Sequence, residues 1–291
     1  MYEHVDLNAI HTRMHAAARH LRLPMHRRVW QGRTGHVLGV GTGSSIEFQD
    51  HRPYAPGDDP RQIDWRAYAR TEHYLMKMHR EEVSPRVDVV LDASRSMVFD
   101  VSKWTRTLEL LYFAVESANA LGSALRCTFL DGHNAHELPA ASLLAYQLPV
   151  PPENDSGSAP DLNAVRWRYG SLRIVISDLL FPGEPGAWLT VLGTAKGHGM
   201  LLAPYSLTEA DPAWSGNLRL ADCETRTERK QRVSPELLAR YRQQYTRHFA
   251  LWQDACARYA LLLARVPSNG PFDHALQEEA VRVGAVELCN S

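Results

Sequence analysis

The chain has 291 residues, of which 44% are hydrophobic and 22% charged, so its length suits one large or two ordinary globular domains. A formal net charge of −1 gives no electrostatic reason to expect binding to nucleic acid or to an anionic membrane. There is no membrane-length apolar run and no signal-peptide pattern, and the four cysteines are widely spaced. We therefore expect a cytoplasmic protein without a membrane span.

The first third of the chain predicts one helix followed by strands and turns. Apolar residues recur at helical spacing over residues 6–22, and Pro24 ends the pattern. Residues 36–50 are rich in glycine and predict strands and turns, and residues 73–80 predict another strand. Between them, residues 52–70 combine Pro, Gly, Asp, Arg and Trp in one compact segment.

From residue 86 onward, strands and helices alternate. Short apolar runs predict buried strands at residues 87–91, 125–130, 172–177 and 199–205. Helical patterns at residues 103–121, 140–147 and 185–196 lie between or beside them. This alternation predicts an α/β fold with a doubly wound, mostly parallel sheet that has helices on both faces.

The last eighty residues predict a hairpin and helices. Residues 217–232 have the charge pattern of an exposed hairpin. Ser234 and Pro235 suit an N-cap and the first position of a helix, which we expect to continue to about residue 262. A short helix over 272–282 and a strand over 284–288 complete the prediction.

Polar side chains follow two of the predicted parallel strands. Asp92, Ser94 and Ser96 come directly after the strand 87–91, and Asp178 follows the strand 172–177. In open α/β sheets, ligands bind beyond the carboxyl ends of the strands. Mg²⁺ prefers oxygen ligands, and hydroxyl ligands leave its charge under-neutralised, so it can accept a carboxylate from another protein. The pattern therefore predicts a magnesium site that recognises a partner.

The Asp92-Ala-Ser94-Arg-Ser96 segment resembles the metal-ion-dependent adhesion site of von Willebrand factor A domains. In that family a Thr from a second loop and an Asp from a third loop complete the site, and Asp178 matches the third loop. The second loop corresponds to residues 157–162, where Pro160 stands in place of the Thr and Ser158 is a substitute hydroxyl. The resemblance implies a von Willebrand A-like domain over residues 84–210.

The segment Arg52–Arg70 narrows the resemblance. Its Pro56-Gly-Asp-Asp-Pro-Arg-Gln-Ile-Asp-Trp65 core is similar to the domain-of-unknown-function 58 family, in which such a segment precedes a von Willebrand A-like domain. We accordingly expect an N-terminal helix and β/turn segment over residues 1–83 and a C-terminal hairpin and helices over residues 211–291. Family genes commonly neighbour MoxR-type AAA+ ATPases, which implies a non-catalytic adaptor for such an ATPase or its client.

Three alternatives remain open at this stage. The metal site could be degenerate, leaving a metal-free scaffold. Asp92 and Asp178 could instead serve a metal-dependent phosphoester hydrolase, and a Ser94–His133–Asp178 hydrolase is also conceivable. Within residues 52–70, the balanced charges favour an ion-pair network with Trp65 as a packing anchor over a ligand surface.

Overall fold

The computed structural model describes residues 5–24, 46–81, 85–148, 160–225 and 227–289. Contacts divide the chain into two units, Gly32–Ser84 and the remainder, formed by Met1–Gln31 with Pro85–Ser291. We call them the small unit and the α/β unit. The first helix, α1 (Leu7–Ala17), packs in the α/β unit, whereas the predicted boundaries group it with the segment that ends at residue 83.

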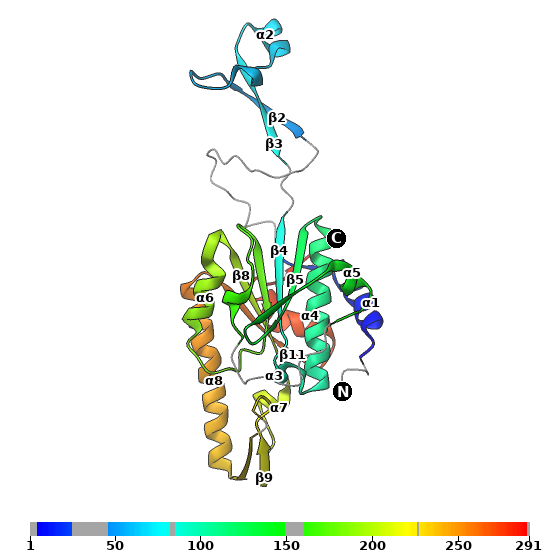
Figure 1. Cartoon of the computed structure of the whole chain (residues 1–291), viewed down its shortest axis with the longest axis vertical. Helices are drawn as coiled ribbons and strands as arrows, with labels where there is room; N and C mark the ends of the chain where they lie inside the picture. Colours follow the sequence, from blue (N-terminus) through cyan, green and yellow to red (C-terminus); the bar gives the residue numbers. More distant parts are fainter. Residues whose placement is uncertain (1–4, 25–45, 82–84, 149–159, 226, 290–291) are drawn as a thin grey trace. The chain divides into compact units, whose positions relative to one another are not determined.

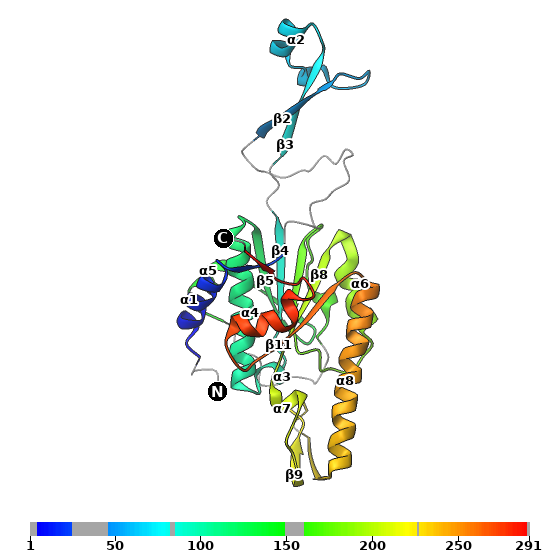
Figure 2. The same ribbon diagram turned by 180° about the vertical axis from the view of Figure 1, so that it is seen from behind.

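A mixed six-stranded sheet forms the centre of the α/β unit (Figures 1 and 2), which confirms the α/β prediction. Its neighbouring strands are, in order, β11 (Leu262–Pro267), β8 (His198–Tyr205), β7 (Leu172–Ile176), β4 (Arg86–Asp92), β5 (Ala124–Asp131) and β6 (Asn134–Leu138). All neighbours pair in parallel except β5 and β6. Chain order reverses between β4 and β7, a place where α/β sheets commonly bind ligands.

Two of these strands were not predicted. The edge strand β6 returns from β5 through a tight turn at Gly132, whose φ is +52°. Strand β11 begins at the residue where the preceding helix was expected to end, because that helix, α8 (Pro235–Arg258), ends earlier. The expected helix end near residue 262 is therefore wrong.

Helices cover both faces of the sheet. On one face, α1, α4 (Val101–Ala120) and α9 (Phe272–Leu276) contribute side chains to one apolar cluster. On the other face, α6 (Pro185–Gly193) and α8 contribute to a second cluster. Along β4 the side chains alternate, so Val89 and Leu91 join the first cluster while Val90 joins the second.

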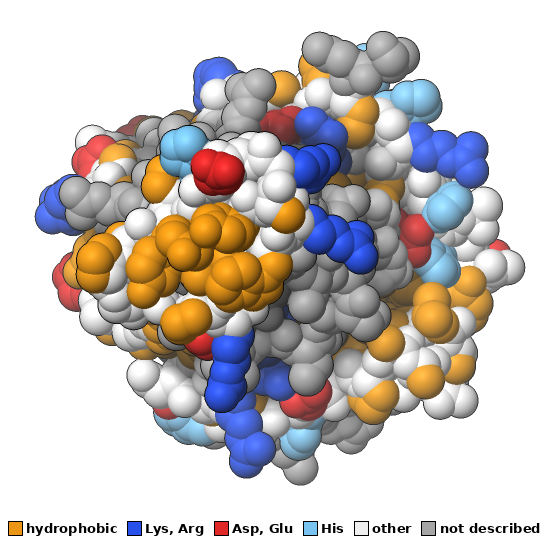
Figure 3. Space-filling view, turned by 90° about the horizontal axis from the view of Figure 1, so that it is seen from above, with side chains coloured by type: hydrophobic (Ala, Val, Ile, Leu, Met, Phe, Trp, Pro, Cys, Tyr) orange, Lys and Arg blue, Asp and Glu red, His pale blue; other side chains and the backbone are white. Residues whose placement is uncertain are grey.

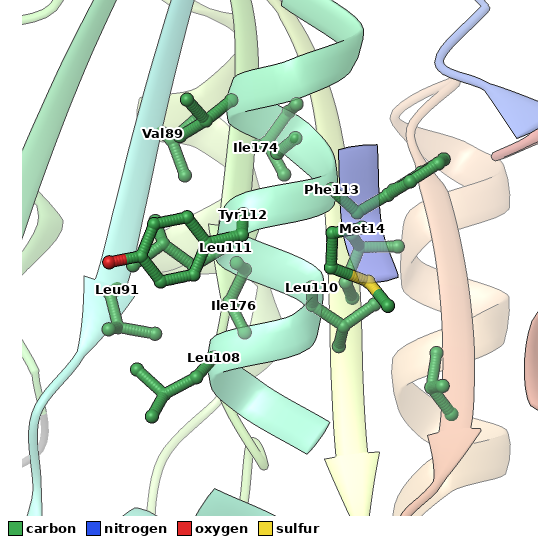
Figure 4. Close-up of a cluster of buried hydrophobic side chains, with 14 of the residues drawn as sticks. Met14, Val89, Leu91, Leu108, Leu110, Leu111, Tyr112, Phe113, Ile174 and Ile176 are labelled. Carbon is green, nitrogen blue, oxygen red and sulfur yellow. The ribbon is translucent and has the colours of Figure 1, made fainter. Parts of the chain in front are cut away.

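Helix α4 lies at the centre of the first cluster. Figure 4 shows its apolar side chains among those of β4, β7 and α1, including Leu108, Leu111 and Phe113. Apolar residues recur at helical spacing on this helix, and the strands below it carry branched aliphatic side chains. The helix is thereby fixed against β4, so the position of its first turn is determined relative to the end of that strand.

The remaining elements of the α/β unit are short or lie at its periphery. They are β1 (Leu21–Arg22), which pairs with β12 (Glu287–Leu288), α3 (Arg95–Val98), α5 (Ala140–Leu144), η3 (Leu162–Ala164), η4 (Thr194–Lys196), α7 (Leu207–Ala210), the antiparallel pair β9 (Gly216–Ala221) and β10 (Glu228–Val233), and η5 (Gln277–Val281). Within the described parts of the chain, no helix has the length and apolar character needed to cross a membrane.

The small unit contains a two-stranded ribbon and two short helices. These elements are β2 (Ile46–Pro53), β3 (Leu75–Glu81), the 3-10 helix η2 (Pro60–Gln62) and α2 (Trp65–Thr71). Acidic side chains act locally: Asp59 and Asp64 cap η2 and α2, and Asp58 accepts two hydrogen bonds from Arg52 at 2.6 and 2.7 Å. The predicted glycine-rich stretch falls largely outside the described residues.

An exposed aromatic cluster covers part of the small unit. Tyr68 and Tyr74 stack with ring centroids 4.6 Å apart, and Trp65 meets both rings edge-on. Figure 3 shows a patch of apolar side chains that is bordered by both acidic and basic side chains. Trp65 packs against both tyrosines, but its side chain is 58% exposed, so it is not buried in a core.

Candidate functional site

The candidate site lies at the carboxyl ends of β4 and β7. Asp92 is the last residue of β4, and Asp178 follows β7 by two positions. Helix α3, helix α7 and the β9–β10 hairpin lie at this same end of the unit (Figure 1). The site is therefore built from loops that only the sheet brings together.

Short contacts connect four of the five predicted site residues. Asp92 accepts from the backbone N–H of Ser94 at 2.9 Å, and the Ser94 and Ser96 hydroxyl oxygens are 3.1 Å apart. The Ser96 hydroxyl lies close enough to Asp178 to help lower the pKa of that carboxyl. The fifth predicted residue, Ser158, lies outside the described residues.

A buried lysine, which the sequence pattern did not single out, completes the site. The Lys103 side chain is fully buried, and its ammonium donates to Asp178 at 2.7 Å and to Glu209 at 2.5 Å. Lys103 lies in the first turn of α4, after the N-cap Asp100. Glu209 belongs to a Ser206-to-Glu209 capping box at α7, a pattern that is visible in the sequence.

The two buried aspartates differ in their electrostatic surroundings. Burial raises the pKa of Asp92 to about 7, and the negative charge of Asp178 adds to this rise. Burial would also raise the pKa of Asp178, but the charge and hydrogen bond of Lys103 lower it below its ordinary value. The same two carboxylates, Asp178 and Glu209, raise the pKa of the Lys103 ammonium despite its burial. The lowered pKa of Asp178 and the raised pKa of Lys103 both favour the ion pair, whereas the Asp92 carboxyl takes up a proton at a higher pH than an ordinary aspartate.

Asp92→Asn is expected to change how stability depends on pH. Because the pKa of Asp92 rises from 3.8 to about 7 on folding, folding takes up a proton between these pH values. The contribution of this carboxyl to stability is complete below pH 3.8. It is lost as the pH rises from 3.8 to about 7, and it stays lost at higher pH. Urea unfolding gives the free energy of unfolding of wild type and of Asp92→Asn at each pH. The wild-type value minus the variant value should fall by up to about 1.4 kcal/mol per pH unit as the pH rises. A difference that stays constant or grows with pH would contradict this expectation.

A carboxylate from the β9–β10 hairpin reaches the same place. Glu224 accepts hydrogen bonds from the backbone N–H groups of Ser96 at 2.8 Å and Arg95 at 3.3 Å. A pocket of about 240 Å³ opens beside it; its lining residues are Ser94, Ser96, Pro160, Asp178, Leu180, Phe181, Pro182, Asp222, Glu224 and Thr225. The two serines of the site thus line a cavity that is also lined by three acidic residues, Asp178, Asp222 and Glu224.

The donor atoms of the predicted site that the structure describes are not arranged to suit Mg²⁺. Both oxygens of Asp178 are engaged, Oδ2 by the Lys103 ammonium and Oδ1 by the backbone N–H of Leu180 at 2.9 Å. Pro160, which the sequence resemblance placed at the position of a Thr, offers no hydroxyl, and its carbonyl accepts a hydrogen bond from Trp188. Within the described residues, no three His, Cys, Asp or Glu side chains are placed to hold a metal ion. The magnesium site stays a prediction without support from this geometry.

The conceivable Ser94–His133–Asp178 constellation is not assembled among the described residues. His133 is largely exposed and lies 3.4 Å from Asp161, and Asp178 is paired with Lys103. The Ser94 hydroxyl contacts Ser96. A serine nucleophile of this kind needs a histidine within hydrogen-bond reach, and the described hydrogen bonds place none beside Ser94.

The fold and the site define an α/β protein with a hydroxyl–carboxylate cluster at the carboxyl edge of its sheet. The family model described as "Protein of unknown function DUF58" matches residues 50–251, and the chain belongs to this family. It is 27% identical over 243 residues to the uncharacterized proteins Rv1480 of Mycobacterium tuberculosis and Mb1516 of Mycobacterium bovis, covering 76% of this chain and 74% of each relative. Among solved structures, BatB from Bacteroides thetaiotaomicron, a conserved hypothetical protein, is similar with a TM-score of 0.36 and 14% identity, over 69% of this chain and 98% of that one.

Proposed function

We propose that this protein is a non-catalytic protein-interaction module, an adaptor that works with a MoxR-type AAA+ ATPase or with that ATPase's client. Its fold is proposed to be a doubly wound sheet of the von Willebrand factor A type. The working surface is the carboxyl edge of the sheet, and the ligand is an acidic side chain of the partner. The ATPase partnership is supported by the family resemblance, and the surface by the contacts described above.

The position of Glu224 carries this proposal. Its carboxylate is held by the N–H groups of Ser96 and Arg95, next to the two serine hydroxyls. Hydrogen bonds to a charged carboxylate are stronger than neutral ones, and these donors are fixed by the turn into α3. An acidic side chain of a partner can use the same donors when the hairpin withdraws Glu224. The edge is therefore suited to carboxylate recognition by exchange.

Exposed apolar side chains near this edge favour a protein over a small molecule as the ligand. Phe99 is 72% exposed, Leu207 is 53% exposed and Val101 is 50% exposed. Phe99 follows α3, Val101 begins α4 and Leu207 begins α7, and the Lys103–Glu209 ion pair joins the last two helices. Large exposed apolar side chains around a polar centre are typical of protein interfaces.

The double variant Ser94→Ala/Ser96→Ala tests the proposal. Wild type should bind a purified MoxR-type ATPase of the same organism in surface plasmon resonance, measured with a non-hydrolysable ATP analogue. Losing the two hydroxyls should weaken that binding by about tenfold or more, because their mutual contact holds the turn that carries the Ser96 and Arg95 N–H groups, and a hydrogen bond from such a group to a charged carboxylate contributes about 1.5–3 kcal/mol. Ser142→Ala is the matched control, because α5 follows the antiparallel strand β6 and lies at the opposite edge of the sheet.

Two results would contradict the adaptor proposal. One is equal ATPase binding by wild type and the double variant. The other is turnover on a panel of phosphoesters and esters that is lost in Asp92→Ala, which would favour the metal-dependent hydrolase with Asp92 and Asp178. Circular dichroism of each variant shows whether the fold is retained, so that a loss of binding reports on the site.

A further inference from the structure

We infer, building on the proposed function, that Lys103 supplies the positive charge of this site and that the carboxylate is bound without a divalent metal ion. The metal-ion-dependent site that the sequence resembles is thereby replaced by an internal cation. Lys103 is thus the group that neutralises the buried acids of the site, in addition to the carboxylate recognition proposed above.

The ammonium of Lys103 is placed where it neutralises the acids of the site. It bonds Asp178, the residue predicted to be a metal ligand, and Glu209 of α7. Its side chain has no exposed surface, and the aliphatic stem runs from the first turn of α4. An ammonium buried to this extent requires partners of opposite charge, and the two carboxylates provide them.

The oxygens of both aspartates are committed to this arrangement. Asp92 accepts from the Ser94 N–H with one oxygen and from the Ser177 hydroxyl, at 2.6 Å, with the other. Asp178 accepts from Lys103 with one oxygen and from Leu180 N–H with the other. A Mg²⁺ ion requires near-octahedral oxygen ligands at about 2.1 Å. To bind Asp178, the ion would have to lie beside the Lys103 ammonium on the same carboxylate, and the two positive charges would repel each other.

The bound carboxylate does not need a bridging metal either. Glu224 is held directly by backbone N–H groups at 2.8 and 3.3 Å. In the metal-dependent arrangement, the ion lies between the serine hydroxyls and the incoming carboxylate. Here the two serine hydroxyls hydrogen-bond each other, the Ser96 hydroxyl lies beside Asp178, and the carboxylate of Glu224 has its own donors. The contacts on both sides of the hydroxyls are thus complete without an ion.

Titration with MnCl₂ and MgCl₂ of chelator-treated protein tests this inference. Metal binding by wild type and by Ser96→Ala is measured by calorimetry and by Mn²⁺ electron paramagnetic resonance. The two proteins should bind the same amount of metal up to millimolar concentration, because no ion is bound at the serines. Lys103→Met should leave the acids without their cation, so its unfolding temperature should rise by several degrees in Mn²⁺. Lys230→Met, an exposed lysine on β10, is the control and should respond as wild type does.

Saturable metal binding by wild type that disappears in Ser96→Ala would overturn the inference. So would a folded Lys103→Met variant that gains no response to Mn²⁺. If Lys103→Met does not fold, the comparison of wild type with Ser96→Ala decides alone. None of these measurements uses the partner, so a failed ATPase interaction would count against the proposed function and leave the metal result unaffected.

Discussion

Lys103→Met is expected to lower the free energy of unfolding by about 3–5 kcal/mol, measured by urea denaturation at neutral pH. Met has a side chain of similar length but no charge, so the packing of the stem is kept while the ammonium is lost. Asp178 and Glu209 would then face each other without their common cation, and Asp178 has almost no contact with water. Leaving a buried charge unpaired costs far more than losing a surface ion pair.

Two controls separate this effect from a general loss of lysine. Lys230→Met, on the exposed face of the hairpin, should leave the denaturation midpoint unchanged within error. The double variant Lys103→Met/Asp178→Asn should be less destabilised than the sum of its two single variants, because the second change removes the unpaired charge. A Lys103→Met variant as stable as wild type would show that the buried ion pair contributes little.

Trp252→Ala should destabilise the protein by about 3–5 kcal/mol, the range for removing a large aromatic side chain from a core. Trp252 is 1% exposed, and its ring meets Trp188 of α6 and Phe181 edge-on. Phe181 also lines the pocket of the candidate site. We therefore expect the substitution to weaken both the second apolar cluster and the loop after β7.

Leu251→Ala is the matched control for this prediction. Leu251 is the preceding residue of α8 and is 53% exposed, so its truncation should have little effect on stability. Thermal and urea unfolding of both variants would give the comparison. Equal stability of Trp252→Ala and Leu251→Ala would mean that α8 does not pack as described, and that the C-terminal region is not part of the α/β core.

The strands and helices of the α/β unit were mostly predictable because their patterns are local. Apolar runs mark β4, β7 and β8, and helical spacing marks α4 and α8. Strand β11 was missed because nothing marks the end of α8: Ala260, with φ of +53°, makes the left-handed turn where glycine would be the usual signal. Strand β6 is short and mostly exposed, although the Asp131-Gly132 pair before it is a hairpin signal.

The site was predictable in part. Asp92, Ser94, Ser96 and Asp178 were found because they follow buried strands whose carboxyl ends meet at one edge. Lys103 was not found, because a single lysine in the first turn of a helix usually faces water. Its burial depends on Glu209 and Asp178, which are 106 and 75 residues away in sequence.

The sequence by itself determined the family, the α/β class and the polar residues at the strand ends, because each rests on a short motif or a local period. Only the tertiary structure decided which charged side chains contact those polar residues. The parallel sheet brings the ends of β4, β7 and β8 together, and helix α4 then places Lys103 between the acids of two other loops. The hairpin brings Glu224 to the same edge. Such pairings depend on distances through space, which no local pattern contains.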